Sequence, residues 1–113
     1  MRQHLKIFKA LGDRSRLRIV KMLEVKAMCV CEITEVLNLA PSTVSKHLSL
    51  LHEADLIEDR KEGKWVNYFL PVKSRIPFVS EILKLIRFSF KDDSQIEADR
   101  KKAKFADRVK ICG

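Results

Sequence analysis

The sequence is poor in glycine, free of long apolar runs and odd in its cysteine count. Its three glycines are scattered over 113 residues, which excludes a glycine-rich loop for phosphate. No apolar run approaches the ~20 residues of a membrane-spanning helix, and residues 1–11 lack the apolar stretch of a secretion signal. Three cysteines without such a signal argue against a structural disulfide framework. We therefore expect a cytoplasmic protein, not bound to a membrane, with reduced thiols.

Positive charge is what the sequence has in excess. Lysine and arginine number 23 against 15 acidic residues, so the formal net charge is +8. In a chain of this length with ordinary apolar content, that excess indicates one folded domain with a polyanionic partner. The sequence also has no cluster of histidines with carboxylates and little length for a substrate cleft, so an enzyme is the least expected class.

Apolar periodicity predicts four helices in the first half of the chain. The first helix should end at Gly12, and Asp13 can cap the second. A third should end near Asn38, and the fourth should begin at Pro41, whose missing N–H is not needed at a first helical position. The buried stripe of this fourth helix is predicted to be Val44, Leu48 and Leu51.

The second half predicts a hairpin with strands at 56–61 and 64–70 around Glu62-Gly63. The helix predicted over Ile76–Phe90 is apolar almost all the way round, so a second copy of the chain is expected to cover it. Ser94-x-x-Glu97 has the spacing of a capping box and predicts a charged last helix that ends near Cys112.

This order of elements predicts a mainly α fold with a β-hairpin, a winged helix-turn-helix. Residues 1–90 would form the DNA-binding and dimerisation domain, and residues 91–113 a charged C-terminal helix and tail. The homodimer would form through the first helix and the Ile76–Phe90 helix.

Candidate DNA contacts are polar side chains opposite the buried stripe of the fourth helix and cations of the hairpin. Short hydroxyls and lysine suit the major groove, and hairpin cations suit the adjacent backbone or minor groove. His47 flanks the buried stripe, so we interpret it as a hydrogen-bonded structural residue. The candidate contacts are Ser42, Ser45, Lys46 and Ser49 on that face, the neighbouring Thr43, and Arg60, Lys61 and Lys64 of the hairpin.

Three stretches of sequence resemble the ArsR/SmtB family of metal-responsive repressors. They are the opening segment 8–18, the segment Thr43-Val44-Ser45-Lys46-His47-Leu48, and the hairpin segment 60–68. The resemblance covers the chain from the first helix to about Phe90. It implies a dimeric winged-helix repressor that binds an imperfect inverted repeat in double-stranded DNA and leaves it when loaded with metal.

The Cys29-Val30-Cys31 segment is similar to the start of the third helix in the arsenic- and antimony-responsive branch of that family. The usual third cysteine of that branch is replaced by Thr34, and Cys112 could supply the missing thiolate. The resemblance thus implies Cys29 and Cys31 as ligands of As(III) or Sb(III), an effector that folding does not require. Cys112 is the candidate third ligand, with an idle thiol in the tail as the alternative. In an intact helix, residues i and i+2 diverge by about 200°, so a shared ion would need the first turn to unwind.

The sequence is also compatible with other effectors and other functions. Zinc at the last apolar helix is disfavoured, because residues 76–90 contain Glu81 but no histidine or aspartate. A redox switch could instead form a disulfide between Cys29 and Cys31, or between one of them and Cys112. An architectural DNA-binding protein without an effector is the alternative from another class, and it would bind all sequences alike.

Overall fold

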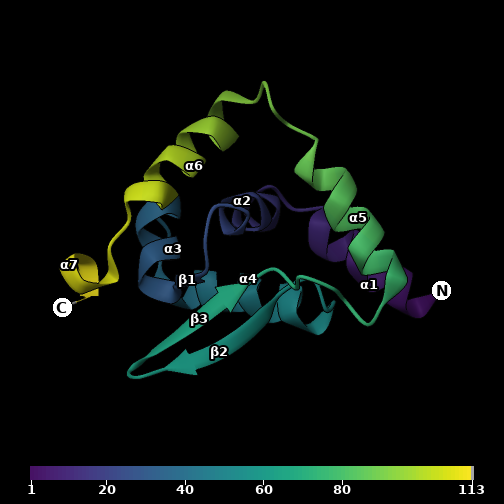
Figure 1. Ribbon diagram of the computed structural model, residues 1–113, viewed down its shortest axis with the longest axis horizontal. Coiled ribbons are helices and arrows are strands. Elements are labelled where there is room, and N and C mark those ends of the chain that lie inside the picture. Colours follow the sequence, from purple (N-terminus) through teal and green to yellow (C-terminus); the bar gives the residue numbers. More distant parts are fainter. Residues whose placement is uncertain (113) are drawn as a thin grey trace.

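The computed structural model describes residues 1–112, the side chain of Cys112 excepted, and has the helical order that periodicity predicts (Figure 1). The helices and strands are α1 (Arg2–Leu11), α2 (Arg14–Leu23), β1 (Met28–Cys29), α3 (Val30–Leu37), α4 (Pro41–Glu53), β2 (Glu58–Glu62), β3 (Trp65–Phe69), α5 (Pro77–Arg87), α6 (Ser94–Phe105) and α7 (Arg108–Cys112). None of the helices in the described part of the chain is long and apolar enough to cross a membrane.

Local signals account for the ends of the first four helices. The Asp13 carboxylate accepts a hydrogen bond from the backbone N–H of Arg16 at 3.0 Å and so caps α2. Asn38 ends α3 in the left-handed conformation, with φ 56°, and Pro41 is the first residue of α4. These four helices pack around a core that includes Ile19, Met22, Ile33, Val44, Leu48, Leu51 and Leu56.

The sheet differs from the predicted hairpin in two ways. Its strand order is β1-β3-β2, because Met28 and Cys29 add a short antiparallel strand beside β3. Glu62 pairs with Trp65, so the turn is Gly63-Lys64 rather than Glu62-Gly63. Gly63 has φ 60° at the first central position, the conformation that favours glycine there in a hairpin turn.

The helices of the second half are shorter than the sequence suggested. α5 ends at Arg87 and not at Phe90, whose φ of 64° is incompatible with continued right-handed helix. Asp93, and not Ser94, caps α6 by accepting from the backbone N–H of Ile96 at 2.9 Å. The last helix is also split in two. The carbonyl of Ala106 accepts from Lys26 Nζ at 2.6 Å, where the backbone is extended.

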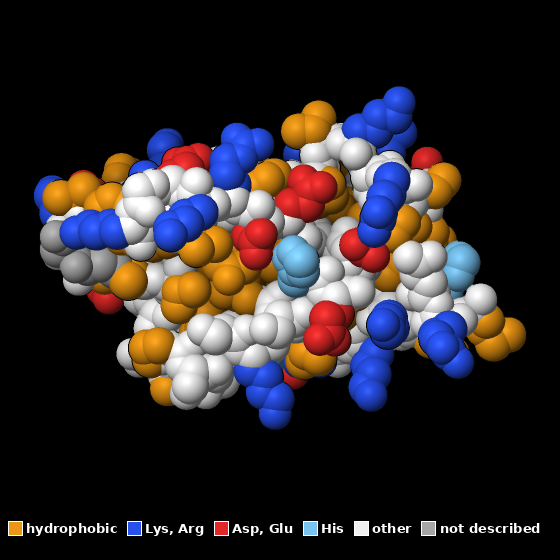
Figure 2. All heavy atoms as spheres, turned by 90° about the horizontal axis from the view of Figure 1, so that it is seen from below, with side chains coloured by type: hydrophobic (Ala, Val, Ile, Leu, Met, Phe, Trp, Pro, Cys, Tyr) orange, Lys and Arg blue, Asp and Glu red, His pale blue; other side chains and the backbone are white. Residues whose placement is uncertain are grey.

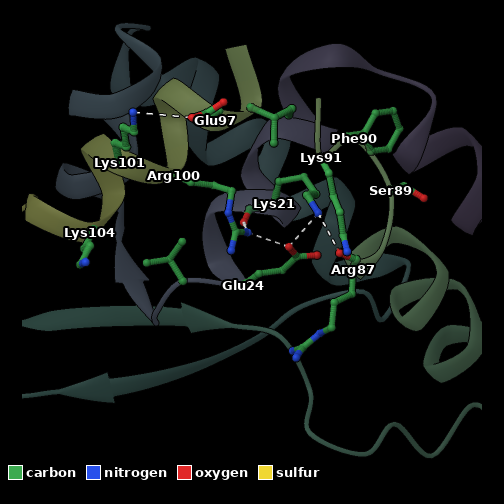
Figure 3. Close-up of a pocket in the computed structure, with 12 residues that line it drawn as sticks. Lys21, Glu24, Arg87, Ser89, Phe90, Lys91, Glu97, Arg100, Lys101 and Lys104 are labelled. Carbon is green, nitrogen blue, oxygen red and sulfur yellow. Dashed lines mark hydrogen bonds and ion pairs between the residues drawn. The ribbon is translucent and has the colours of Figure 1, made fainter. Parts of the chain in front are cut away.

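α5 and α6 lie at opposite ends of the molecule, beside α1 and α3 respectively (Figure 1). α6 is fixed to α2 by charged groups. Arg18 donates two hydrogen bonds to the buried Asp99 carboxylate, at 2.7 and 2.9 Å. Beside them, Glu24 accepts from Arg100 at 2.7 Å and pairs with Lys21 at 2.8 Å, at the floor of an open cleft of about 620 Å³ (Figure 3).

Candidate DNA interface and thiol site

The polar face of α4 is directed to solvent, as helix geometry predicts. Val44, Leu48 and Leu51 are buried on the opposite face and hold the helix on the core. The exposed candidate contacts on α4 are Ser42, Thr43, Ser45, Lys46 and Ser49. They therefore form one hydroxyl-rich surface with a single cation, which is available to a macromolecular partner.

Arg16 of α2 links α4 to α1 by hydrogen bonds. Its Nε donates to the carbonyl of Ala10 at 2.8 Å, and its Nη1 lies 3.2 Å from Nδ1 of His47. His47 is half-buried and hydrogen-bonded to Arg16, as expected for a structural histidine. Arg16 thus joins α1, α2 and α4, an arrangement that orients the exposed face of α4.

The hairpin presents its cations beside acidic residues. All of β2 is exposed, and it carries Arg60 and Lys61 among three carboxylates. The Arg60 guanidinium lies 5.5 Å from the ring centroid of Phe69, and Lys64 Nζ lies 4.8 Å from that of Trp65. Figure 2 shows the molecule from below. Lys and Arg side chains lie along the edges of this lower face, and acidic side chains and a histidine lie nearer its middle.

Cys29 and Cys31 occupy different environments. Cys29 belongs to β1 and caps α3, and only 2% of it is exposed, so it is not a helical residue as the sequence suggested. The Glu32 carboxylate accepts from the backbone N–H of Cys29 at 3.1 Å. Burial, opposed in part by a backbone hydrogen bond, raises the pKa of the Cys29 thiol above its ordinary value.

Cys31 lies in the first turn of α3, where it is half-buried and disulfide-bonded, whereas Cys29 is a free thiol. The side chain of Cys112, the remaining predicted ligand, lies outside the described residues. One turn after Cys31, the Thr34 hydroxyl is buried and has no hydrogen-bond partner among the residues that the structure describes. Within that same part of the chain, no group of three or more His, Cys, Asp or Glu side chains could hold a metal ion.

Comparison with known proteins identifies the family. Residues 13–59 match the family described as "Bacterial regulatory protein, arsR family". An uncharacterized HTH-type transcriptional regulator of Methanocaldococcus jannaschii is 46% identical over 81 residues, which are 71% of this chain and 86% of that protein. The chain belongs to the ArsR family. It is thus a transcriptional regulator of that family with a winged helix-turn-helix fold.

Two further proteins are similar to this ArsR-family chain. The arsenical resistance operon repressor of Escherichia coli is 45% identical over 67 residues, 58% of this chain and 57% of that repressor. Reduced HlyU from Vibrio cholerae is 30% identical, with a TM-score of 0.63 over 74% of this chain and 84% of the HlyU chain. The chain therefore spans little more than half of the E. coli repressor but most of HlyU.

Sequence reasoning missed one residue of this ArsR-family chain that contacts the hairpin. Arg108, in α7, places its guanidinium carbon 4.5 Å from the ring centroid of Trp65 and donates to Asn67 Oδ1 at 2.7 Å. The residue is 41 positions from its hydrogen-bond partner. No local pattern in the sequence indicates such a contact.

Proposed function

We propose that this chain is a cytoplasmic, homodimeric repressor that releases double-stranded DNA when Cys31 is oxidised. It is a regulator and not an enzyme. The observation that supports this proposal most directly is the disulfide at Cys31. This residue lies in the first turn of α3, the helix that packs against α4. A covalent change at that turn can alter the position of α4 and so its fit to DNA.

In this proposal, α4 enters the major groove and the hairpin follows the adjacent backbone. The exposure of all the candidate side chains of α4 supports the first contact, and the exposed β2 strand supports the second. Two copies related by a two-fold axis would read an imperfect inverted repeat, with half-sites about 10–10.5 base pairs apart or a multiple of that spacing.

The dimer would form across an apolar surface shared by α1 and α5. Phe78 of α5 packs on His4 and Phe8 of α1, with ring centroids 4.4 and 5.5 Å apart. Phe8 of α1 and Leu85 of α5 are 53% and 66% exposed. Side chains of this kind on adjacent helices are typical of a self-complementary interface.

Cys112 is the proposed partner of Cys31. Cys29 is free, and α7, which ends at Cys112, packs on α3. With hydrogen peroxide as oxidant, the Cys31 thiolate attacks one oxygen and breaks the O–O bond, which yields a sulfenic acid, and the departing hydroxide takes up a proton from solvent to become water. The Cys112 thiol then attacks that sulfur, so the disulfide forms and a second water leaves. The two thiols together give two electrons to the peroxide.

Fluorescence anisotropy on DNA from upstream of the gene tests this function. Reduced protein should bind one sequence specifically, and peroxide should release it. Cys31→Ser and Cys112→Ser should bind in both states, whereas Cys29→Ala should still respond because that thiol takes no part. Release of Cys31→Ser by peroxide at wild-type concentrations would contradict the proposal, and equal affinity for all sequences would indicate an architectural protein.

Release by As(III) or Sb(III) is the second candidate, favoured by the name of the E. coli relative. Both Cys29 and Cys31 would then serve as thiolate ligands, with Cys112 as a third. Because Cys29 is buried and caps α3, such binding requires the start of α3 to open. Arsenite is added to protein reduced with a phosphine, which does not compete for arsenic. If stoichiometric arsenite releases DNA from the wild-type protein but not from Cys29→Ala, arsenic is the effector. If arsenite releases no DNA, oxidation remains the proposed signal.

A further inference from the structure

Arg108 of α7 holds both strands of the hairpin. Its Nη1 donates to Asn67 Oδ1 on β3 at 2.7 Å, and its Nη2 lies 4.0 Å from Glu62 Oε2 at the end of β2. Its guanidinium also covers the ring of Trp65, 4.5 Å from the centroid. A single side chain from the C-terminal helix therefore makes an ion pair, a hydrogen bond and a stacking contact with the hairpin.

Asn67 connects this contact to the thiol site. It is 7% exposed, its Nδ2 donates to Glu62 Oε2 at 2.8 Å, and its backbone pairs with Cys29 in the sheet. Cys29 leads directly into the turn of α3 that carries Cys31. Asn67 is buried and its side-chain Oδ1 accepts from Arg108. Loss of Arg108 would therefore leave that oxygen without this donor.

α7 cannot hold its position by itself. A helix of five residues is far below the ~12–15 residues at which isolated helices become marginally stable. Its order depends on its packing against α3 and on the contacts of Arg108. A covalent bond between the thiol of Cys31 and the end of α7 would raise the fraction of time that Arg108 spends on the hairpin.

We propose that α7 is an oxidation-dependent latch, with Arg108 as the positioning residue that fixes the hairpin. The proposal rests on the proposed function, in which the disulfide of Cys31 marks the DNA-released state. In that state Arg108 holds the hairpin against α7. When the bond is reduced, α7 departs and the hairpin can adjust to the DNA backbone.

Trp65 is the single tryptophan of the chain, so its fluorescence reports directly on the latch. Wild-type protein should show different Trp65 emission in the oxidised and reduced states, and Arg108→Ala should remove most of that difference. Lys104→Ala is the matched control, because its ammonium stacks on Phe105 within α6 at 5.8 Å and not on the hairpin. Circular dichroism verifies that each variant is folded. Identical Trp65 emission in both states of the wild-type protein would overturn the latch.

DNA affinity separates the latch from the proposed function. Oxidised Arg108→Ala should bind the operator about tenfold more tightly than oxidised wild type, while the reduced forms bind alike. The same coupling acts in reverse. In Arg108→Ala the equilibrium with glutathione should therefore shift toward the reduced thiols by a similar factor. Wild-type release with unchanged behaviour of Arg108→Ala overturns the latch alone. If oxidation changes the Trp65 emission of the wild-type protein but not its DNA affinity, the proposed function is overturned, while the oxidation-dependent contact of Arg108 with the hairpin stands.

Discussion

Lys46 is the one cation among the exposed candidate contacts of α4, so it is the residue on which the proposed DNA contact can be tested most directly. Its replacement by alanine should weaken DNA binding in the reduced protein and lower the slope of log affinity against log salt by about 1. The response to peroxide should be unchanged, because Cys31 is not altered. Lys102→Ala, an exposed cation on α6, removes the same charge and should leave both quantities as they are.

Cys29 affects stability through its pKa. Burial raises the folded-state pKa of this thiol, so the folded protein retains a proton that the unfolded chain releases. The stabilising effect is complete below the ordinary thiol pKa of about 8.5 and is lost as pH rises toward the folded-state value. The free energy of unfolding should therefore fall more steeply between neutral and alkaline pH with Cys29 than with Cys29→Ala.

Urea denaturation across that pH range measures the difference. Both proteins carry Cys31→Ser and Cys112→Ser, so that thiol–disulfide exchange at alkaline pH does not intervene. Tyr68, whose pKa burial also raises, is present in both and cancels in the comparison. Parallel pH profiles for the two proteins would mean that the Cys29 thiol titrates alike in the folded and unfolded chains.

At the scale of elements, the ion pair of Arg18 with Asp99 is the most buried of the charged contacts that hold α6 on α2. The Asp99 side chain is fully buried and that of Arg18 is 16% exposed, and two hydrogen bonds join them. Asp99→Ala would leave the Arg18 charge buried without its partner, a change that typically costs about 3–5 kcal/mol. We expect urea melts followed by circular dichroism to show that loss.

The matched control lies on the same helix. Glu97 pairs with Lys101 at 3.6 Å on an exposed surface, and such pairs contribute about 0.3–0.5 kcal/mol. Glu97→Ala should therefore leave the midpoint of unfolding almost unchanged. A loss in Asp99→Ala no larger than in Glu97→Ala would contradict the assignment of Arg18–Asp99 as the anchor of α6.

Elements with a local signal could be predicted from the sequence, and those that depend on distant contacts could not. Helices α1 to α4 have apolar periodicity and local caps such as Asp13. β1 has only two residues and therefore no periodicity, and it exists because β3 pairs with it. The break after α6 is accompanied by a hydrogen bond from Lys26, 80 positions away.

The candidate site divides in the same way. The exposed face of α4 follows from helix geometry once Val44 is buried, so its candidate contacts could be placed in advance, namely Ser42, Ser45, Lys46 and Ser49. The divergence of Cys29 and Cys31 was also expected from helix geometry, but its cause in the structure, β1 in place of the first residue of the expected helix, could not be predicted. Arg108 could not be found either, because its partners Trp65 and Asn67 are brought to it by the tertiary fold.

At the scale of the whole molecule, the proposed dimer requires the α1–α5 surface to be buried. Leu85 is 66% exposed on α5, and a charge there would have to be buried unpaired in a two-fold interface, where it would occur twice. Leu85→Glu should therefore be monomeric in analytical ultracentrifugation while remaining folded. Because a monomer engages one half-site at a time, its affinity for the inverted repeat should fall at least about 100-fold.

Phe105→Glu separates the dimer surface from exposed apolar residues in general. Phe105 is 78% exposed, but it lies on α6, at the end of the molecule opposite to α5 (Figure 1). We expect this variant to remain dimeric and to bind DNA as the wild type does. If Leu85→Glu also stays dimeric, the two-fold axis must pass through another surface. If Phe105→Glu alone becomes monomeric, the C-terminal helices form that surface, and the spacing of the half-sites must then be derived from α6.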